Sequence, residues 1–415
     1  MSLRDAPSNQ TSSDAGQRAE WRRNQAVVTG AAFIGSTAFT LVMPFLPLYI
    51  QELGVADVHQ AALWAGLSLG ITPAITALVS PFWGRVADRY GRKLLLERSI
   101  VAFVIVMALM ACATQAWQIF ALRAALGFVA GYGALTVAMA AENAPPEHMS
   151  PAIGTVQTAQ RLGPALGPVI GGGLAAAAGI RRSFLVTACF YVVALLLIGL
   201  LYREKQDTKE AGDSARKRQA TFADVLRFPN FPVLVAGVFV LQFVERSVGP
   251  ILPLVVAELG APRDGVALAS GLIFSVIAIM AAAGAQLAGR LMQRGTAKRV
   301  VLAGTWTTVV AVIVAAAAGH VTILGAALGL GGLAVGVAMT ACYAVVGSTT
   351  PAGMHATTFG LLASGSLVGL AIGPTASGLV ASLGFRVVFC LDALMLAVFA
   401  SSVARFMSEK TSWPG

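Results

Sequence analysis

Charged side chains are scarce in this sequence. Asp, Glu, Lys and Arg together make up 12% of its 415 residues, which is about half of their share in ordinary soluble domains. Hydrophobic residues reach 57%, and the mean hydropathy is +0.76. Such a composition cannot cover a surface that faces water, whereas a surface that faces lipid can be as apolar as a protein core. The composition therefore excludes a water-soluble domain and predicts an all-α membrane protein.

Cysteine and histidine are also rare, at four residues each. The cysteines fall in apolar segments without the paired spacing of metal ligands, which is typical of small packing residues. The chain has no G-x-x-x-x-G-K-[ST] loop for binding phosphates, so nothing indicates ATP as the energy source. We therefore expect no metal, no cofactor and no ATP, and an enzyme is the least expected class of protein.

Twelve apolar segments are long enough to cross a bilayer, which takes about 20 residues in an α-helix. They lie near residues 25–50, 62–83, 94–113, 117–140, 152–178, 183–202, 230–256, 267–288, 299–318, 321–346, 356–382 and 385–405. We expect twelve transmembrane helices in two pseudo-symmetric six-helix bundles. The expected domains are an N-terminal tail over 1–24, bundles over 25–202 and 230–406, a linker over 203–229 and a C-terminal tail over 407–415. The N-terminal tail contains no secretory apolar region, so we interpret it as a tail on a retained first helix.

The net charge of +10 is distributed by side of the membrane. If both termini are cytoplasmic, the tails and inner loops carry 22 of the 29 Lys and Arg residues, and the outer loops carry four. Three arginines, Arg123, Arg161 and Arg246, fall inside spans. This bias follows the positive-inside rule. The basic charge therefore predicts an orientation in the membrane, with both termini cytoplasmic, and no binding of nucleic acid.

An internal repeat relates the two halves at an offset of 206 residues. The stretch Pro44–Gly54 recurs as Pro250–Gly260 with seven of eleven positions identical. The same offset maps Gly163, Ala165, Gly167, Pro168 and Gly172 onto Gly369, Ala371, Gly373, Pro374 and Gly378. Two parallel six-helix repeats are typical of transporters that rock about a site at the middle of the membrane. The paired prolines at 44, 47, 250 and 253 either loosen the first helix of each half or simply end its span.

The loop between the second and third spans reads Gly84-Arg-Val-Ala-Asp-Arg-Tyr-Gly-Arg-Lys93. This string resembles the G-x-x-x-D-R-x-G-R-K signature of the major facilitator superfamily, in which it forms a latch. The positions that carry the resemblance are Gly84, Asp88, Arg89, Gly91, Arg92 and Lys93. The resemblance implies that Asp88 docks near the start of span 11 and that Arg92 pairs with Glu142. In the second half the acid is replaced by Gln293, so we expect a one-sided latch.

A glycine and proline motif occupies span 5. Its members are Gly163, Gly167, Pro168, Gly171 and Gly172. Small residues at this spacing allow a neighbouring helix to approach closely, and packing alone would explain them. The pattern G-x-x-x-G-P-x-x-G-G also resembles the motif of the proton-coupled, twelve-span drug antiporters in the superfamily.

In span 4, Arg123 is followed by Gly127 and Gly131, similar to a further signature of the family. An arginine in a span should face the bundle interior.

Proton coupling requires an ionisable group inside the membrane, and span 1 has no acid between residues 26 and 50. Our first choice is Glu245 on span 7, the repeat counterpart of span 1. We expect Arg246 to point about 100° away from it around the helix. The alternative is a static ion pair of Glu245 with Arg123 or Arg161.

Two further residues inside spans complete the candidate site. Asp392 on span 12 is expected to be a buried hydrogen-bonding partner rather than the proton carrier. Arg161, close to Gln157 and Gln160, is a candidate for lining the inner cavity and contacting substrate.

Three functions stay open. The first is proton-driven export of amphipathic small molecules by alternating access, with the proton as coupling ion. The second is export of one dedicated metabolite, sugar or siderophore. The third is a transporter-like sensor or lipid-handling protein without ion coupling, which the missing acid in span 1 favours. In each case the expected partners are a small molecule and the lipid bilayer, and we expect a monomer in a bacterial inner membrane.

Overall fold

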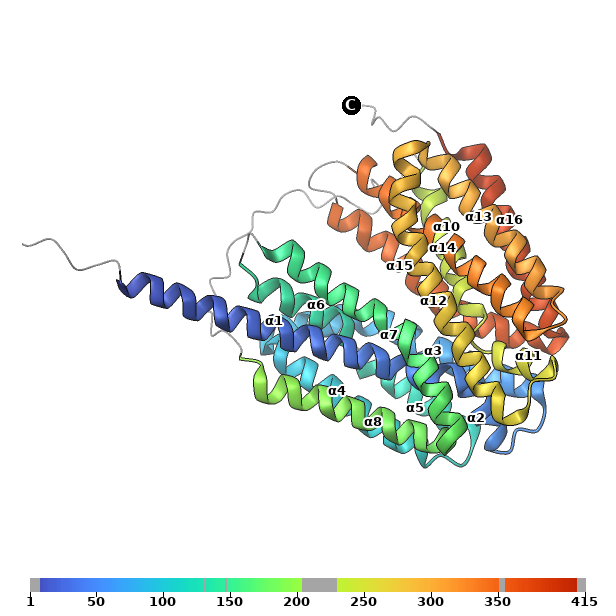
Figure 1. The fold of residues 1–415 in the computed structure, drawn as a ribbon, viewed down its shortest axis with the longest axis horizontal. Coiled ribbons are helices and arrows are strands. Elements are labelled where there is room, and N and C mark those ends of the chain that lie inside the picture. The colour runs from blue at the N-terminus through green and yellow to red at the C-terminus, as the bar shows by residue number, and fades with distance from the viewer. Residues whose placement is uncertain (1–7, 130, 146–147, 204–229, 351–354, 409–415) are drawn as a thin grey trace, which may run out of the picture.

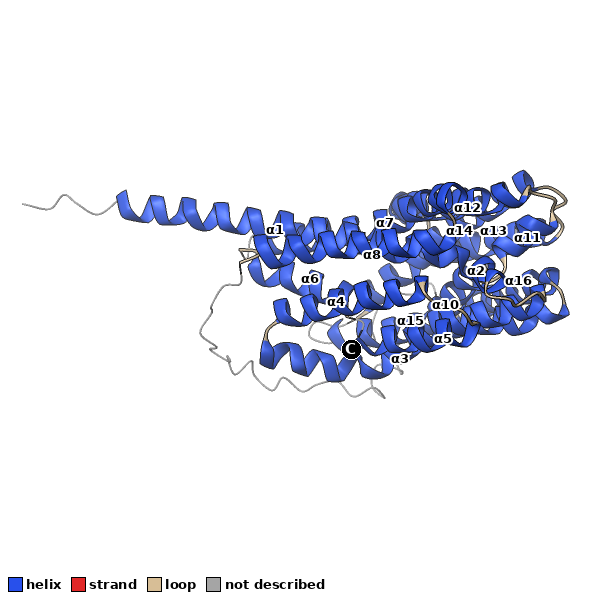
Figure 2. Ribbon diagram, turned by 90° about the horizontal axis from the view of Figure 1, so that it is seen from below, coloured by secondary structure: helices blue, strands red, loops and turns tan. Residues whose placement is uncertain are grey.

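The protein is an assembly of long helices in the computed structural model (Figure 1). The structure describes residues 8–129, 131–145, 148–203, 230–350 and 355–408, and these include no β-strand. Figure 2 shows helices joined by short loops, with the start of α1 projecting beyond its neighbours. The first half of the chain forms one group of helices and the second half forms another, as expected from the repeat.

The first half begins with a span broken into three parts, and a second break divides its fourth span. Its elements are α1 (Ser8–Val42), η1 (Met43–Phe45), α2 (Leu46–Glu52), α3 (Val58–Tyr90), α4 (Arg92–Ala111), α5 (Ala116–Val129), α6 (Tyr132–Asn143), α7 (Met149–Ala178), α8 (Ile180–Leu196) and the π-helical turn η3 (Leu197–Leu201). Because α1 begins at Ser8, most of the expected N-terminal tail continues the first span as helix.

The second half repeats this order. Its elements are α10 (Phe231–Ser247), α11 (Leu252–Glu258), α12 (Arg263–Arg294), α13 (Ala297–Ala316), α14 (Val321–Thr349), α15 (His355–Val380), η4 (Ala381–Leu383) and α16 (Phe385–Phe406). The expected linker over 203–229 lies outside the described residues apart from Arg203.

Ten helices of the described residues are long and apolar enough to cross a membrane, and α10 with α11 forms an eleventh span bent by 45°. The twelfth predicted span corresponds to α7, which is 30 residues long. Its glycines, its two internal prolines and Arg161 make it less apolar than the others. It lies between α1 and α12, so it belongs to the bundle by position.

Glycines bring the paired helices of each half into contact. A methyl group at Gly167 would lie 2.7 Å from the carbonyl oxygen of Thr37, so α7 packs closely on α1. The repeat counterpart Gly373 would meet the carbonyl oxygen of Phe243 at 2.6 Å, so α15 packs on α10 in the same way. The repeat found in the sequence is therefore a repeat of helix packing.

The two halves touch along two equivalent helix pairs, α3 with α15 and α7 with α12. Gly66 on α3 lies against Pro374 and Gly378 of α15. Gly271 on α12 lies against Pro168 and Gly172 of α7. We call the ends of the halves near these contacts and near Glu52 the outer ends, and the opposite ends, near Asn24, the inner ends. Figure 1 shows the halves meeting at the outer ends and diverging toward the inner ends.

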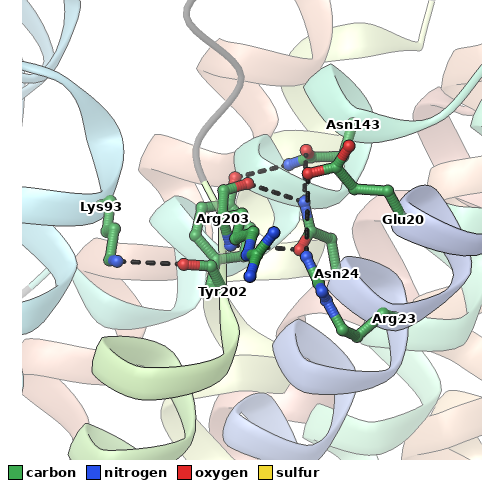
Figure 3. Close-up of polar contacts among 7 residues, drawn as sticks. All are labelled: Glu20, Arg23, Asn24, Lys93, Asn143, Tyr202 and Arg203. Atoms are coloured by element: carbon green, nitrogen blue, oxygen red, sulfur yellow. Dashed lines mark hydrogen bonds and ion pairs between the residues drawn. The ribbon is translucent and has the colours of Figure 1, made fainter. Parts of the chain in front are cut away.

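A buried asparagine closes the inner end of each half. Asn24 on α1 donates to the carbonyl oxygen of Arg203 at 2.8 Å and accepts from the Arg203 amide at 3.2 Å. Its side chain also donates to Asn143 at 3.3 Å, and Asn143 donates to the hydroxyl of Tyr202 at 2.5 Å (Figure 3). These bonds join α1, the end of α6 and the segment after η3, so the first and last spans of the half are fixed together.

Candidate functional site

The face of α7 that meets the other half continues inward as a polar face. Residues at 157, 161, 164, 168 and 172 lie within an arc of about 80° on a helix of 3.6 residues per turn. Pro168 and Gly172 of this set contact α12. Gln157 and Arg161 are exposed at the inner end of the same face, where the halves stand apart. The helical face thus directs Arg161 toward the side on which the halves stand apart, and its contact with substrate stays a prediction.

On α7 the neighbouring Gln160 has a different role. Its side-chain amide donates to the carbonyl oxygen of Gly133 and to the hydroxyl of Thr136, both at 2.9 Å. Gln160 therefore fastens α7 to α6 inside the first half and leaves Arg161 and Gln157 to face the opening.

Glu245 lies in the last turn of α10, directly before the break in its span. The expectation that Arg246 points away from it is wrong. Arg246 Nη2 lies 3.6 Å from Glu245 Oε1, because two long side chains can reach each other around the last turn. The side chains are 31% exposed for Glu245 and 44% exposed for Arg246, so neither is enclosed by the surrounding helices. The carboxylate is thus held by a neighbour on its own helix.

The break after Glu245 follows from proline. Pro250 has no amide hydrogen, so the carbonyl oxygen of Arg246 loses its usual helical donor and accepts from Gly249 at 3.2 Å instead. The chain then resumes as α11. The prolines of the second half therefore break the span rather than simply end it. In the first half, Pro44 and Pro47 lie in η1 and α2, and the span Glu20–Glu52 continues through them without such a bend. A methyl group at Gly249 would lie 3.5 Å from Leu69 of α3, so the break adjoins the other half.

Arg123 on α5 is 1% exposed and faces the interior of the first half, as the sequence predicted for an arginine in a span. Its Nε donates to the carbonyl oxygen of Ser68 at 3.1 Å, and its guanidinium contacts Met43. The ring of Phe39 lies 5.8 Å from its Cζ, which allows a cation–π interaction. The hypothesis of a static ion pair between Glu245 and Arg123 or Arg161 is wrong for this conformation, since Glu245 pairs with Arg246.

Asp392 on α16 is 1% exposed. Ser247, the last residue of α10, lies 2.5 Å from its Oδ2 through the serine hydroxyl. Ser377 of α15 donates to the carbonyl oxygen of Ser247. The prediction of a buried hydrogen-bonding partner is confirmed, and the bond is to the residue where the broken span begins to bend.

The loop signature fastens the inner ends of three helices. Arg92 Nη1 lies 2.9 Å from Glu142 Oε1 and 3.1 Å from the carbonyl oxygen of Ala138, so the predicted pair is confirmed and joins α4 to α6. Gly91 is the single residue between α3 and α4, and its φ of 91° explains the glycine there. The side chain of Lys93 donates to the carbonyl oxygen of Tyr202 at 3.0 Å.

Other positions of this signature carry less structural information. Gly84 lies within α3, whereas the side chain of Asp88 lies outside the part that the structure describes, so the docking of Asp88 near span 11 stays a prediction. Arg89 is exposed and lies over the ring of Tyr90, with 5.5 Å between its Cζ and the ring centroid.

The sequence analysis missed the break in span 4 and the groups that stabilise it. The carbonyl oxygens of Phe128 and Val129, freed at the end of α5, accept from Trp83 Nε1 at 2.6 Å and from Arg98 Nη2 at 3.1 Å. The Arg98 guanidinium also lies over the Trp83 ring, 3.5 Å from its centroid. Gly127 and Gly131 were the signal for a break, but its donors come from α3 and α4.

No cluster of three or more His, Cys, Asp or Glu residues able to hold a metal ion occurs in the described ranges. The site consists of an inner opening with Arg161, a bent span carrying Glu245, and two buried groups, Arg123 and Asp392. In the described ranges these elements bring together one exposed cationic side chain, one partly exposed carboxylate and two buried ionisable side chains.

The comparison with protein families decides the class. A model of the Major Facilitator Superfamily matches residues 28–294 and again 234–414. The chain belongs to the major facilitator superfamily. It is therefore a multi-pass membrane protein of two related helical bundles, as predicted.

The chain is also similar to curated members of this superfamily over nearly its whole length. It is 35% identical over 379 residues to the multidrug resistance protein MdtG of Serratia proteamaculans, covering 91% of this chain and 92% of the relative. It is 34% identical over 387 residues to MdtG of Yersinia enterocolitica, covering 92% of each.

Two solved structures share the fold. A bacterial homologue of the human lysosomal transporter Spinster, in an inward-facing and unoccupied conformation, superposes with a TM-score of 0.76 at 17% identity, covering 96% of this chain and 99% of that one. The human organic anion transporter MFSD10 superposes with a TM-score of 0.65 at 20% identity, covering 92% and 99%.

Proposed function

We propose that this protein is a multidrug efflux transporter that exports amphipathic small molecules in exchange for protons. The observation that carries the proposal is the similarity to multidrug resistance proteins across nine tenths of the chain. The glycine motif of span 5 supports the same group, because its residues form the contacts of α7 with both α1 and α12.

The proposed cycle uses the two helix pairs that join the halves. In the present conformation the outer ends are closed by α3 with α15 and α7 with α12, and the inner ends stand apart. A drug entering from the cytoplasm or inner leaflet would contact Arg161 and Gln157 and then the apolar walls near Phe39. Separation of the outer contacts would then release it on the other side of the membrane.

Glu245 is the proposed proton carrier of this cycle. It lies beside the bend of α10, it is 31% exposed, and Arg246 can stabilise its charged form. A proton that reaches Glu245 would neutralise the carboxylate and weaken its attraction to Arg246. Because Gly249 lies next to Leu69 of α3, a conformational change at this bend can alter the packing between the two halves.

The proposal includes an orientation and a set of partners. The excess of Lys and Arg at the inner ends supports cytoplasmic termini and insertion in a bacterial inner membrane. The partners are the drug, the proton and the lipid bilayer, and the protein acts as a monomer without a cofactor or a chemical reaction on its substrate.

Proteoliposomes with an imposed pH gradient provide the test. We expect the wild-type protein to accumulate or expel a fluorescent cationic dye according to the direction of the gradient. Glu245→Gln should bind the dye and lose the dependence on the gradient. Glu258→Gln, an exposed acid on the same broken span, is the matched control and should behave as wild type. Gradient-driven transport that persists in Glu245→Gln would remove this residue as proton carrier.

The alternatives give different results. A dedicated exporter of one metabolite, sugar or siderophore would protect cells from few compounds or none in a susceptibility screen, whereas a multidrug exporter protects from several unrelated ones. A transporter-like sensor or lipid-handling protein without ion coupling would show no dye-dependent proton flux even as wild type.

A further inference from the structure

Asp392 is a buried carboxyl group without a cationic partner. The helices packed on α16 are α13, α10 and α15, together with η4. The charged groups that these elements bring are Glu245 and Arg246 on α10 and Lys298 and Arg299 at the inner end of α13, while α16 itself carries Arg386 and Arg405 near its two ends. In the described ranges none of them forms an ion pair with Asp392, and nothing donates to its Oδ1. A carboxylate in such a place is costly, whereas a neutral carboxylic acid is not.

The hydroxyl of Ser247 has two partners and one hydrogen. It lies 2.9 Å from the carbonyl oxygen of Val244 and 2.5 Å from Asp392 Oδ2. A carbonyl oxygen only accepts, so a bond to Val244 uses the serine hydrogen. The hydrogen between Ser247 and Asp392 must then come from Asp392. If Asp392 is ionised, the serine hydrogen turns to Asp392 and leaves Val244.

These alternatives are two protonation states of one site. In the protonated state Asp392 donates to Ser247, and Ser247 donates to the Val244 carbonyl within the last turn of α10. In the ionised state Ser247 donates to Asp392, and that turn loses a bond. Between the two states Asp392 Oδ2 gains or loses one proton, which comes from water or returns to it. No other covalent bond forms or breaks.

The same serine marks the bend of the span. Ser247 is the last residue of α10, and its own carbonyl oxygen accepts from Ser377 of α15. A change in the hydrogen bond of Ser247 is therefore transmitted to the last turn of α10, which also carries Glu245 and Arg246, and to α15, which packs on α3 of the other half.

We propose that Asp392 and Ser247 form a second proton-binding site, separate from Glu245, whose protonation controls the bend between α10 and α11. The inference rests on the proposed proton-coupled export, and it adds a buried acid that is never exposed to the drug. In the inward-open conformation Asp392 holds a proton, and its release accompanies the rearrangement of the broken span.

Asp392→Asn separates this proposal from a merely structural role. The asparagine amide can donate to Ser247 as the protonated acid does, so the fold should persist, but it cannot ionise. We expect the variant to bind dye and to exchange it down a concentration gradient while gradient-driven transport falls at least tenfold. A structural role alone predicts transport close to wild type, and that result would overturn the proposal.

Infrared difference spectroscopy between acidic and alkaline pH gives a readout independent of transport. The carbonyl stretch of a protonated buried acid should be present in wild type and in Glu245→Gln, and absent in Asp392→Asn. Ser247→Ala should shift this band, because the acid loses its bonding partner, while Ser401→Ala on the exposed face of α16 should leave it in place. If Asp392→Asn does not fold, an unshifted band in Ser247→Ala contradicts the proposal by itself.

Different results would contradict the proposed function and the second proton site. Absence of gradient-driven transport in the wild-type protein would contradict the proposed function. Full coupling in Asp392→Asn together with coupling in wild type would contradict only the second proton site.

Discussion

Asn24 and Asn230 occupy equivalent places in the two halves and make the same pair of hydrogen bonds. Asn24 accepts from the Arg203 amide and donates to the Arg203 carbonyl, at 3.2 and 2.8 Å. Asn230 accepts from the Ser408 amide and donates to the Ser408 carbonyl, at 2.8 and 3.2 Å. Each side chain therefore ties the beginning of the first span in its half to the chain that leaves the last span. Each half is closed at its inner end by its own asparagine.

Replacing these asparagines should lower thermal stability. Asn24→Ala removes the two part-buried hydrogen bonds to the Arg203 backbone, each of which contributes about 0.5–1.5 kcal/mol. We expect a lower unfolding temperature in detergent, measured by intrinsic tryptophan fluorescence.

The second asparagine allows a finer comparison. Asn230 has a φ of 68°, so Asn230→Gly removes only the side-chain bonds, whereas Asn230→Ala adds the strain of an L-residue in the left-handed region. Asn230→Ala should be the less stable by about 1 kcal/mol. Equal stabilities of the two variants would show that the backbone conformation adds nothing.

Three consecutive glycines in α7 should respond differently to alanine. A methyl group at Gly171 would overlap the carbonyl of Leu41, so Gly171→Ala should separate α7 from α1 and reduce folded protein. At Gly172 it would lie 2.7 Å from the carbonyl oxygen of Ala267 in the other half. Gly172→Ala should therefore fold but favour open outer ends, seen as a longer spin-label distance between the outer ends of α7 and α12. Gly173 has no atom within 4 Å of that position, so Gly173→Ala is the control. A common phenotype for all three would contradict this division.

Straightening the broken span should raise the thermal stability of the protein and slow its transport. Pro250→Ala supplies an amide hydrogen that can donate to the Arg246 carbonyl, and proline inside a helix costs about 3 kcal/mol. We expect a higher unfolding temperature and slower gradient-driven transport in proteoliposomes. Pro232→Ala, in the exposed first turn of α10 where proline is tolerated, should change neither quantity. Faster transport by Pro250→Ala would mean that the bend is not needed for the cycle.

The pair of Arg92 and Glu142 should contribute little energy on its own. The two side chains are 27% and 53% exposed, and such pairs are typically worth up to about 1 kcal/mol. A double-mutant cycle with Arg92→Gln and Glu142→Gln should give a coupling energy in that range, decreasing as salt is added. Because both residues lie in the first half, Glu142→Gln should keep gradient-driven transport. Loss of transport without loss of stability would instead indicate a role in the conformational change.

The sequence predicted structural contacts best for residues that belong to the internal repeat or to a family motif. The offset of 206 residues predicted which glycines would be equivalent, and the signature predicted the partner of Arg92. The same offset also relates Asn24 to Asn230, so extending the repeat to polar residues would have found both asparagines.

The errors arose where the position of a side chain depends on a break in a helix or on other helices. The angle of 100° between Glu245 and Arg246 is that of the Cβ atoms, and two long side chains in a last turn can still meet. The break in span 4 depends on Trp83 and Arg98, which come from α3 and α4 and have no signal in span 4 itself.

The paired contacts of the halves have the form of a twofold symmetric dimer. Gly66 of the first half meets Pro374 of the second, and Gly271 of the second meets Pro168 of the first. In an isologous interface between two identical subunits, each surface contacts its own copy in this reciprocal way. A single ancestral half could therefore have assembled with itself through these glycines. Fusion into one chain then allowed the copies to differ, with a buried arginine in one and the acids of the broken span in the other.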